Sequence, residues 1–199
     1  SGSATITVVP PSTGGTPTSY TVTAGDSSGV ALSPAKTCTV TAPATSCTIS
    51  SLTNGTSYTF STTATNSAGS STSASAASSA VTPANIPSEP LSVSGSGTGG
   101  SAIVSWSVPD SNGGSAITDY IIEYSVDGSG SWSTFTDAVS AATSTTVSGL
   151  TAGSSYIFRV TAKNAIGNSL SSISSAKVST LPTAPSIASV TAGNSEVAV

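Results

Sequence analysis

Two cysteines, Cys38 and Cys47, are the residues whose type and spacing most directly imply chemistry in this sequence. They flank the segment TVTAPATS, and strands leaving so short a connection can lie close enough for a disulfide. Closing a loop of about ten residues would stabilise the fold by about 2–3 kcal/mol. Such a bridge would pin an edge strand and would indicate an oxidising, extracytoplasmic location. The alternative is a pair of free, buried thiols in a reducing cytosol.

Other reactive groups are sparse. The sequence has no histidine, so neither a Ser-His-Asp nor a Cys-His arrangement can form. Two thiols alone make an incomplete zinc site, and the 8 acidic residues are scattered without an EF-hand pattern. Asp119 and Glu123 fit an ordinary solvated strand face better than a carboxylate pair. We therefore expect no active site, no metal and no cofactor.

Two aromatic residues could instead contact a ligand. Trp132 and Phe135 lie near an expected edge strand, where they could form a platform for a sugar. The alternative is that they cover the edge of the sheet. The glycine-rich stretches Gly25–Gly29 and Asp127–Trp132 open no helix, so they indicate hairpin turns and not phosphate cradles. Polysaccharide is thus the ligand class that this region suggests.

Composition narrows the partners further. With 4 basic residues and a net charge of -4, the chain cannot neutralise many phosphates, so we expect no nucleic acid partner. No apolar run approaches the roughly 20 residues of a membrane helix, so we expect no membrane insertion within this stretch. Serine and threonine abound, but 36% of the residues are hydrophobic and follow a period, which favours a folded chain over a low-complexity stalk.

One phrase occurs twice. Leu52–Gly69 reads LTNGTSYTFSTTATNSAG, and Leu150–Gly167 reads LTAGSSYIFRVTAKNAIG. In the second copy Tyr156, Phe158 and Val160 fall on one face of a period-two pattern, which predicts a half-buried strand between two turns.

Other strands come in matching pairs. Ser3–Val9 answers Ser101–Val108, and Ser19–Ala24 answers Asp119–Ser125. Glycine, proline, asparagine and serine turns separate these short strands. The sequence therefore predicts an all-β fold made of tandem immunoglobulin-like sandwiches.

The repeated pattern resembles tandem fibronectin type III modules. The resemblance implies a tyrosine corner in each module, in which the phenol hydroxyl bonds back to nearby backbone. Val8 stands where the second module has a tryptophan, so we expect a smaller first core. The residues that carry the resemblance, and that it places in the structural cores, are Leu52, Tyr58, Trp106, Tyr120, Leu150 and Tyr156.

Prolines mark the expected boundaries. We expect residues 1–83 to form a module without its first strand, 84–181 to form a complete module, and 182–199 to supply the first strands of a third. Two accounts of this arrangement remain open. The last residues could complete the first module of a neighbouring chain, as in donor-strand assembly. The repeat of a second-strand pattern in NSEVAV, Asn194–Val199, favours a window on a longer tandem array.

The expected function is structural and non-enzymatic. Repeated modules set reach without individual ligands, and the serine- and threonine-rich composition resembles long surface proteins of bacteria. The sequence thus indicates a stalk, surface fibre or adhesin filament that associates with itself or with other surface proteins. The alternatives are an accessory or linker module of a secreted polysaccharide-degrading enzyme, and a decoration of a phage or other particle.

Overall fold

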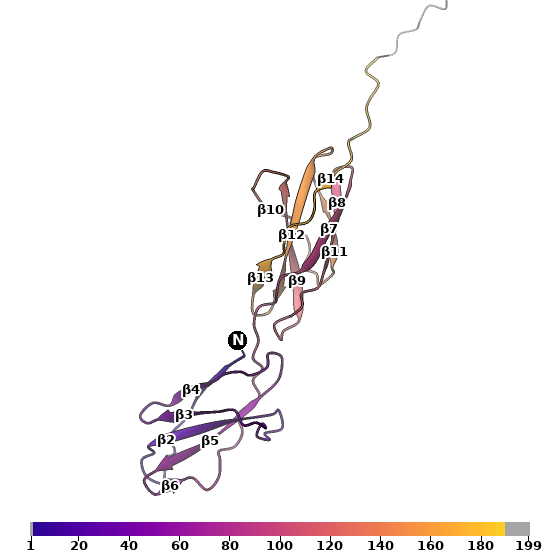
Figure 1. The fold of residues 1–199 in the computed structure, drawn as a ribbon. Helices are drawn as coiled ribbons and strands as arrows, with labels where there is room; N and C mark the ends of the chain where they lie inside the picture. The colour runs from indigo at the N-terminus through magenta and orange to yellow at the C-terminus, as the bar shows by residue number, and fades with distance from the viewer. Residues whose placement is uncertain (1, 190–199) are drawn as a thin grey trace, which may run out of the picture.

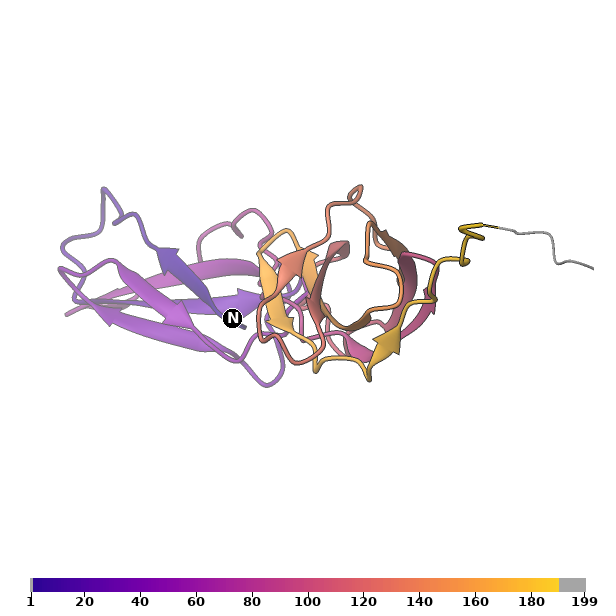
Figure 2. The same ribbon diagram turned by 90° about the horizontal axis from the view of Figure 1, so that it is seen from above.

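The computed structural model describes residues 2–189 and shows two β-sandwiches, one after the other along the chain (Figures 1 and 2). We call residues 2–83 the first module and residues 84–181 the second module. Every regular element in residues 2–189 is a strand, which confirms the all-β prediction. No helix in this range could therefore serve as a membrane span.

The first module is built from two antiparallel sheets. The smaller sheet has two strands, and the larger has four. The smaller sheet pairs β1 (Ala4–Thr7) with β4 (Ser46–Ile49). The order in the larger sheet is β3 (Thr37–Thr41), β2 (Ser19–Gly25), β5 (Thr59–Asn66) and β6 (Gly69–Ser70).

The second module repeats this plan with one more strand in its smaller sheet. The order in the smaller sheet is β11 (Ser144–Ser148), β8 (Ser101–Ser107) and β7 (Leu91–Thr98). The order in the larger sheet is β10 (Ser133–Thr134), β9 (Ile117–Val126), β12 (Ser155–Asn164) and β13 (Asn168–Ser171), with β14 (Val178–Ser179) also paired to β12. In the first module, no described strand occupies the place of β7.

Each module has its own hydrophobic core. Alternate side chains of β12, Tyr156, Phe158 and Val160, point into the second core, where Phe158 is fully buried. Trp106 packs edge-on against Tyr120, with ring centroids 5.2 Å apart. The first core uses the smaller Val8 at the position of Trp106, as the sequence indicated.

Both tyrosine corners are formed. The backbone N–H of Thr53 donates to the hydroxyl of Tyr58 at 2.9 Å, and that of Thr151 donates to Tyr156 at 2.9 Å. Leu52 and Leu150, the residues before the two threonines, are buried. The repeated leucine-to-tyrosine spacing therefore fixes the same turn into the same strand in both modules.

The segment after the second module extends away from it (Figure 1). Residues 182–189 are exposed and contain no strand. The rest of the expected third module, residues 190–199, lies outside the described residues, so that expectation stays a prediction.

Candidate functional site

The two modules meet at a close backbone contact. The turn at Asn54 and Gly55 belongs to the first module, and Gly114 belongs to the loop between β8 and β9 of the second. Gly114 has a φ of +83°, and a Cβ added there would overlap the backbone of Asn54 and Gly55. The Gly55 N–H also donates to the Pro83 carbonyl at 2.9 Å, which ties the start of the linker to the same turn. Glycine is required here both for its conformation and for its lack of a side chain.

Asn164, at the end of β12, holds the linker from the second module. Its side chain is 2% exposed, and its Nδ2 donates to the carbonyls of Asn85 and Asn112, both at 2.8 Å. Its Oδ1 accepts from the N–H groups of Ile166 and Gly167 at 2.9 and 3.1 Å. One buried amide therefore joins the linker, the β8–β9 loop and the β12–β13 turn. We call the contacts of Gly114 and Asn164 the joint.

The first module carries the same asparagine in a different setting. Asn66 is exposed, and its Nδ2 donates to the carbonyl of Gly14 at 2.7 Å. Asn66 and Asn164 both brace the loop after the second-strand position, but only Asn164 also binds a linker. Asn66 is thus a matched control for the joint.

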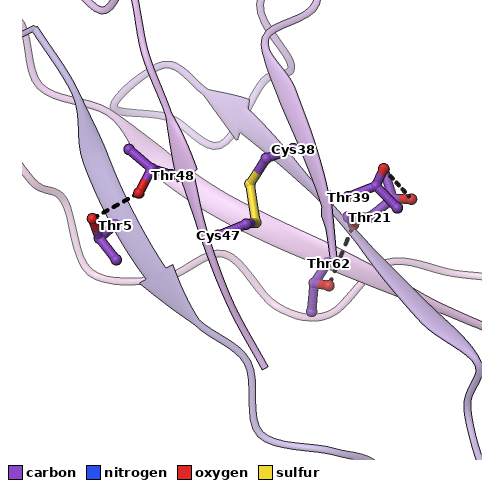
Figure 3. Close-up of a disulfide and its surroundings, with 7 residues drawn as sticks. All are labelled: Thr5, Thr21, Cys38, Thr39, Cys47, Thr48 and Thr62. Carbon is purple, nitrogen blue, oxygen red and sulfur yellow. Dashed lines mark hydrogen bonds between the residues drawn. A yellow bond between two sulfur atoms is a disulfide. The ribbon is translucent and has the colours of Figure 1, made fainter. Parts of the chain in front are cut away.

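Cys38 and Cys47 form a disulfide with Cα atoms 6.1 Å apart, as predicted (Figure 3). Cys38 lies on β3 and Cys47 on β4, so the bond connects the two sheets of the first module. Both residues pack against the first core. The bridge therefore staples a sandwich whose smaller sheet has only two described strands.

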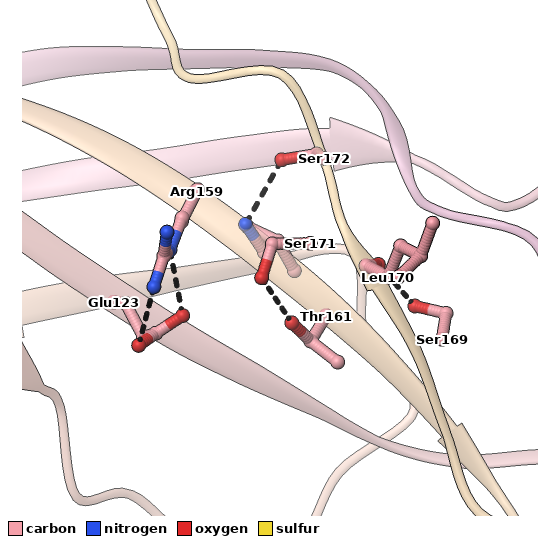
Figure 4. Close-up of polar contacts among 8 residues, drawn as sticks. Glu123, Arg159, Thr161, Ser169, Leu170, Ser171 and Ser172 are labelled. Atoms are coloured by element: carbon pink, nitrogen blue, oxygen red, sulfur yellow. Dashed lines mark hydrogen bonds and ion pairs between the residues drawn. The ribbon is translucent and has the colours of Figure 1, made fainter.

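Trp132 is engaged within the molecule. The Arg159 guanidinium lies 4.3 Å from the centroid of its ring, and the same guanidinium donates to both carboxylate oxygens of Glu123 at 2.8 and 3.0 Å (Figure 4). The hydrogen bond to Glu123 raises the pKa of Arg159. This stack lies on the outer face of β9 and β12 and covers the ion pair.

Phe135 and the remaining carboxylates also serve the fold. Phe135 packs against the second core, and its N–H donates to the Ile122 carbonyl at 2.8 Å. Asp119 accepts from the Ser140 N–H at 3.1 Å, which anchors the loop before β11. Burial, and then the charge of Asp119, raises the pKa of Asp137. In the described part of the chain, no group of three or more Cys, Asp and Glu side chains could hold a metal.

A row of serines that sequence reasoning missed closes each larger sheet. Beside β12, the hydroxyls of these serines accept from inward-facing strand amides (Figure 4). Ser172 and Ser175 also donate their own N–H groups to carbonyls of β12. The serines lie three residues apart while their strand partners lie two apart, a spacing that could have revealed them. The pairs are Ser169 with Ala162, Ser172 with Val160, Ser175 with Phe158, Ser71 with Ala64, Ser75 with Thr62, and Ser78 with Phe60.

Removing one of these hydroxyls should be costly. In Ser175→Ala the buried Phe158 N–H loses its 3.1 Å acceptor, so we expect the second module to lose about 1–3 kcal/mol of unfolding free energy. Urea unfolding followed by tryptophan fluorescence measures this loss, because Trp106 and Trp132 both lie in the second module. The exposed Ser174→Ala is the control, and equal stability of the two variants would refute the expectation.

Comparison with known proteins gives one family and a set of similar structures. The family model described as "Fibronectin type III domain" matches residues 1–81 and 86–178. A crystal structure of titin domains is 23% identical, with a TM-score of 0.55, over 80% of this chain and 54% of that one. Chicken CNTN1 FN1–FN3 domains are 17% identical, with a TM-score of 0.46, over 83% of this chain and 57% of that one. The twitchin kinase region of C. elegans is 36% identical, with a TM-score of 0.45, over 49% of this chain and 17% of that one. The chain thus spans less than two thirds of the length of each of these structures.

Proposed function

Because the chain belongs to the fibronectin type III family, we propose that it is a non-enzymatic spacer within a long extracellular tandem-repeat protein. A stalk, a surface fibre or an adhesin filament would each use it in this way. Modules of this family are commonly structural or linker units. The observation that carries the proposal is the joint, which fixes one module on the next.

A spacer must keep its reach under thermal motion. A linker of free residues would let the modules tumble independently. Here Asn164 binds the carbonyl of Asn85 in the linker, and the Gly55 N–H binds that of Pro83. Gly114 brings the two backbones into contact. These contacts support a stiff connection whose energy comes from hydrogen bonds and close packing rather than from charge.

An extracellular location fits the covalent chemistry. A disulfide that joins the two sheets of a module persists in oxidising compartments. The surface is solvated mainly by serine and threonine, with only 4 basic and 8 acidic residues. Together with the repeat, this composition supports a bacterial surface protein.

The joint can be tested with one substitution. We expect Asn164→Ala to leave both sandwiches folded and to loosen the linker, because the Asn85 carbonyl loses its buried donor. Small-angle scattering should then show a broader distribution of inter-module distances, and NMR relaxation should show unequal tumbling of the two modules. Asn66→Ala is the matched control and should tumble like the wild type. A wild-type chain whose modules already tumble independently would contradict the spacer function.

The accessory-module alternative is tested at Trp132. Because Arg159 stacks on this ring, we expect no Trp132-dependent retention of the protein on insoluble polysaccharides. A pull-down on cellulose, chitin and xylan would compare the wild type with Trp132→Ala. Specific retention that disappears in the variant would favour an accessory module of a polysaccharide-degrading enzyme.

A further inference from the structure

An apolar groove of about 830 Å³ runs along the first module. One wall is β1 with its flanking residues, the floor includes Val22 and Phe60, and the other wall is the segment 75–81. Within the described residues β1 pairs only with β4, so its other edge has no strand partner. We call this feature the open groove.

The second module shows what fills the equivalent place. There β7 pairs with β8 on one side and lies against β14 on the other. The effect is visible at a pair of matched valines, each bridged to the tyrosine of its corner: Val178 is 5% exposed and Val81 is 47% exposed. The open groove therefore has the walls of a β7 site and exposes apolar surface that a strand would bury.

A second cavity extends the open groove. It measures about 480 Å³, shares Val8 and Val9 with the open groove, and includes Pro11 and Tyr20 in its lining. In the second module the corresponding loop is followed by the chain entering β7, where the Ser88 N–H donates to the Ser111 carbonyl at 2.9 Å. Pro87 and Pro90 of that entering chain are buried. The shape thus suits an extended Pro-x-x-Pro segment that continues into a strand.

The chain contains a second segment of this kind. Pro182 and Pro185 reproduce the spacing of Pro87 and Pro90, and SIASVTAG follows them as LSVSGSGT follows the first pair. Residues 182–189 are exposed. We propose that the segment 182–199 of a second copy of this chain fills the open groove, adding a strand to β1 in the way that β7 adds one to β8.

The occupant comes from another copy because of where the segment leaves the molecule. In Figure 1 residues 182–189 extend from the end of the second module that faces away from the first. A contact between one end of a copy and the other end of the next is heterologous, and such contacts propagate into open chains unless the rotation closes a ring. Each added copy would offer a new open groove. This inference is independent of where the protein works and does not rest on the spacer function.

Three versions of the chain test the proposal by sedimentation velocity. We expect the 199-residue chain to form species heavier than the 19.0 kDa monomer as its concentration rises, and the chain of residues 1–181 to stay monomeric. Ser189→Pro should weaken the association strongly, because proline cannot donate to a strand ladder. The matched control Ser189→Ala should associate like the wild type. Ser189 lies outside both sandwiches, so neither substitution can unfold them.

Amide hydrogen exchange then locates the contact. Adding a peptide of residues 182–199 to the chain of residues 1–181 should slow exchange in β1 at least about tenfold. The strands of the second module should be unaffected. Association that persists without residues 182–199, as in edge-to-edge pairing of two β1 strands, would overturn the proposal. A 199-residue chain that stays monomeric at every concentration, or a peptide that protects no amide of β1, would also overturn it.

Discussion

Phe158→Ala is expected to lower the unfolding free energy of the second module by about 3–5 kcal/mol, the range for deleting a fully buried phenylalanine. Phe158 has no exposed surface and lies at the centre of β12, between β9 and the serine row. Its N–H is bound by the Ser175 hydroxyl. The site cannot collapse easily, because the paired strands on both sides hold the backbone in place.

Tryptophan fluorescence reads this loss selectively, because both tryptophans lie in the second module. Phe60→Ala is the matched change in the first module. Phe60 is 6% exposed and lines the open groove, so truncation there should cost about 3 kcal/mol or less and should leave the fluorescence transition in place. A Phe158→Ala transition that coincides with the wild type would mean that this residue does not sustain the second core.

The features with a local signature could be predicted from the sequence. The period-two pattern around Phe158 follows directly from strand geometry. The Leu150-to-Tyr156 spacing fixes the tyrosine corner because the hydroxyl bonds only five residues back, to Thr151. The disulfide was predictable for the same reason, since Cys38 and Cys47 lie only 9 positions apart.

The features that depend on tertiary contacts escaped prediction. Asn164 in the sequence resembles any turn asparagine, and only the folded chain places Asn85 beside it. Trp132 was expected either to bind a ligand or to cover a sheet edge. It instead lies over Arg159, whose position is set by the pairing of β9 with β12. In the serine row, exposed and bonded serines have the same composition, so composition alone could not distinguish them.

Removing the disulfide is expected to cost the first module about 2–3 kcal/mol of unfolding free energy, on the chain-entropy estimate for so short a loop. The double variant Cys38→Ser with Cys47→Ser makes this change. The bond joins β3 of the larger sheet to β4 of the smaller one, and β4 has only β1 as a described strand partner. Loss of the bond should therefore free the smaller sheet first.

The two modules provide the control within one molecule. Hydrogen exchange at Ile49 and Val40 should accelerate in the double variant, while the tryptophan transition of the second module should stay unchanged. Reducing agent should reproduce the effect in the wild type and add nothing in the variant. If reduction leaves exchange at Ile49 unaltered, the first core and not the disulfide holds the two sheets together. If the tryptophan transition also shifts, the joint couples the stabilities of the two modules, because Gly55 and Pro83 of the first module hold the linker that Asn164 binds.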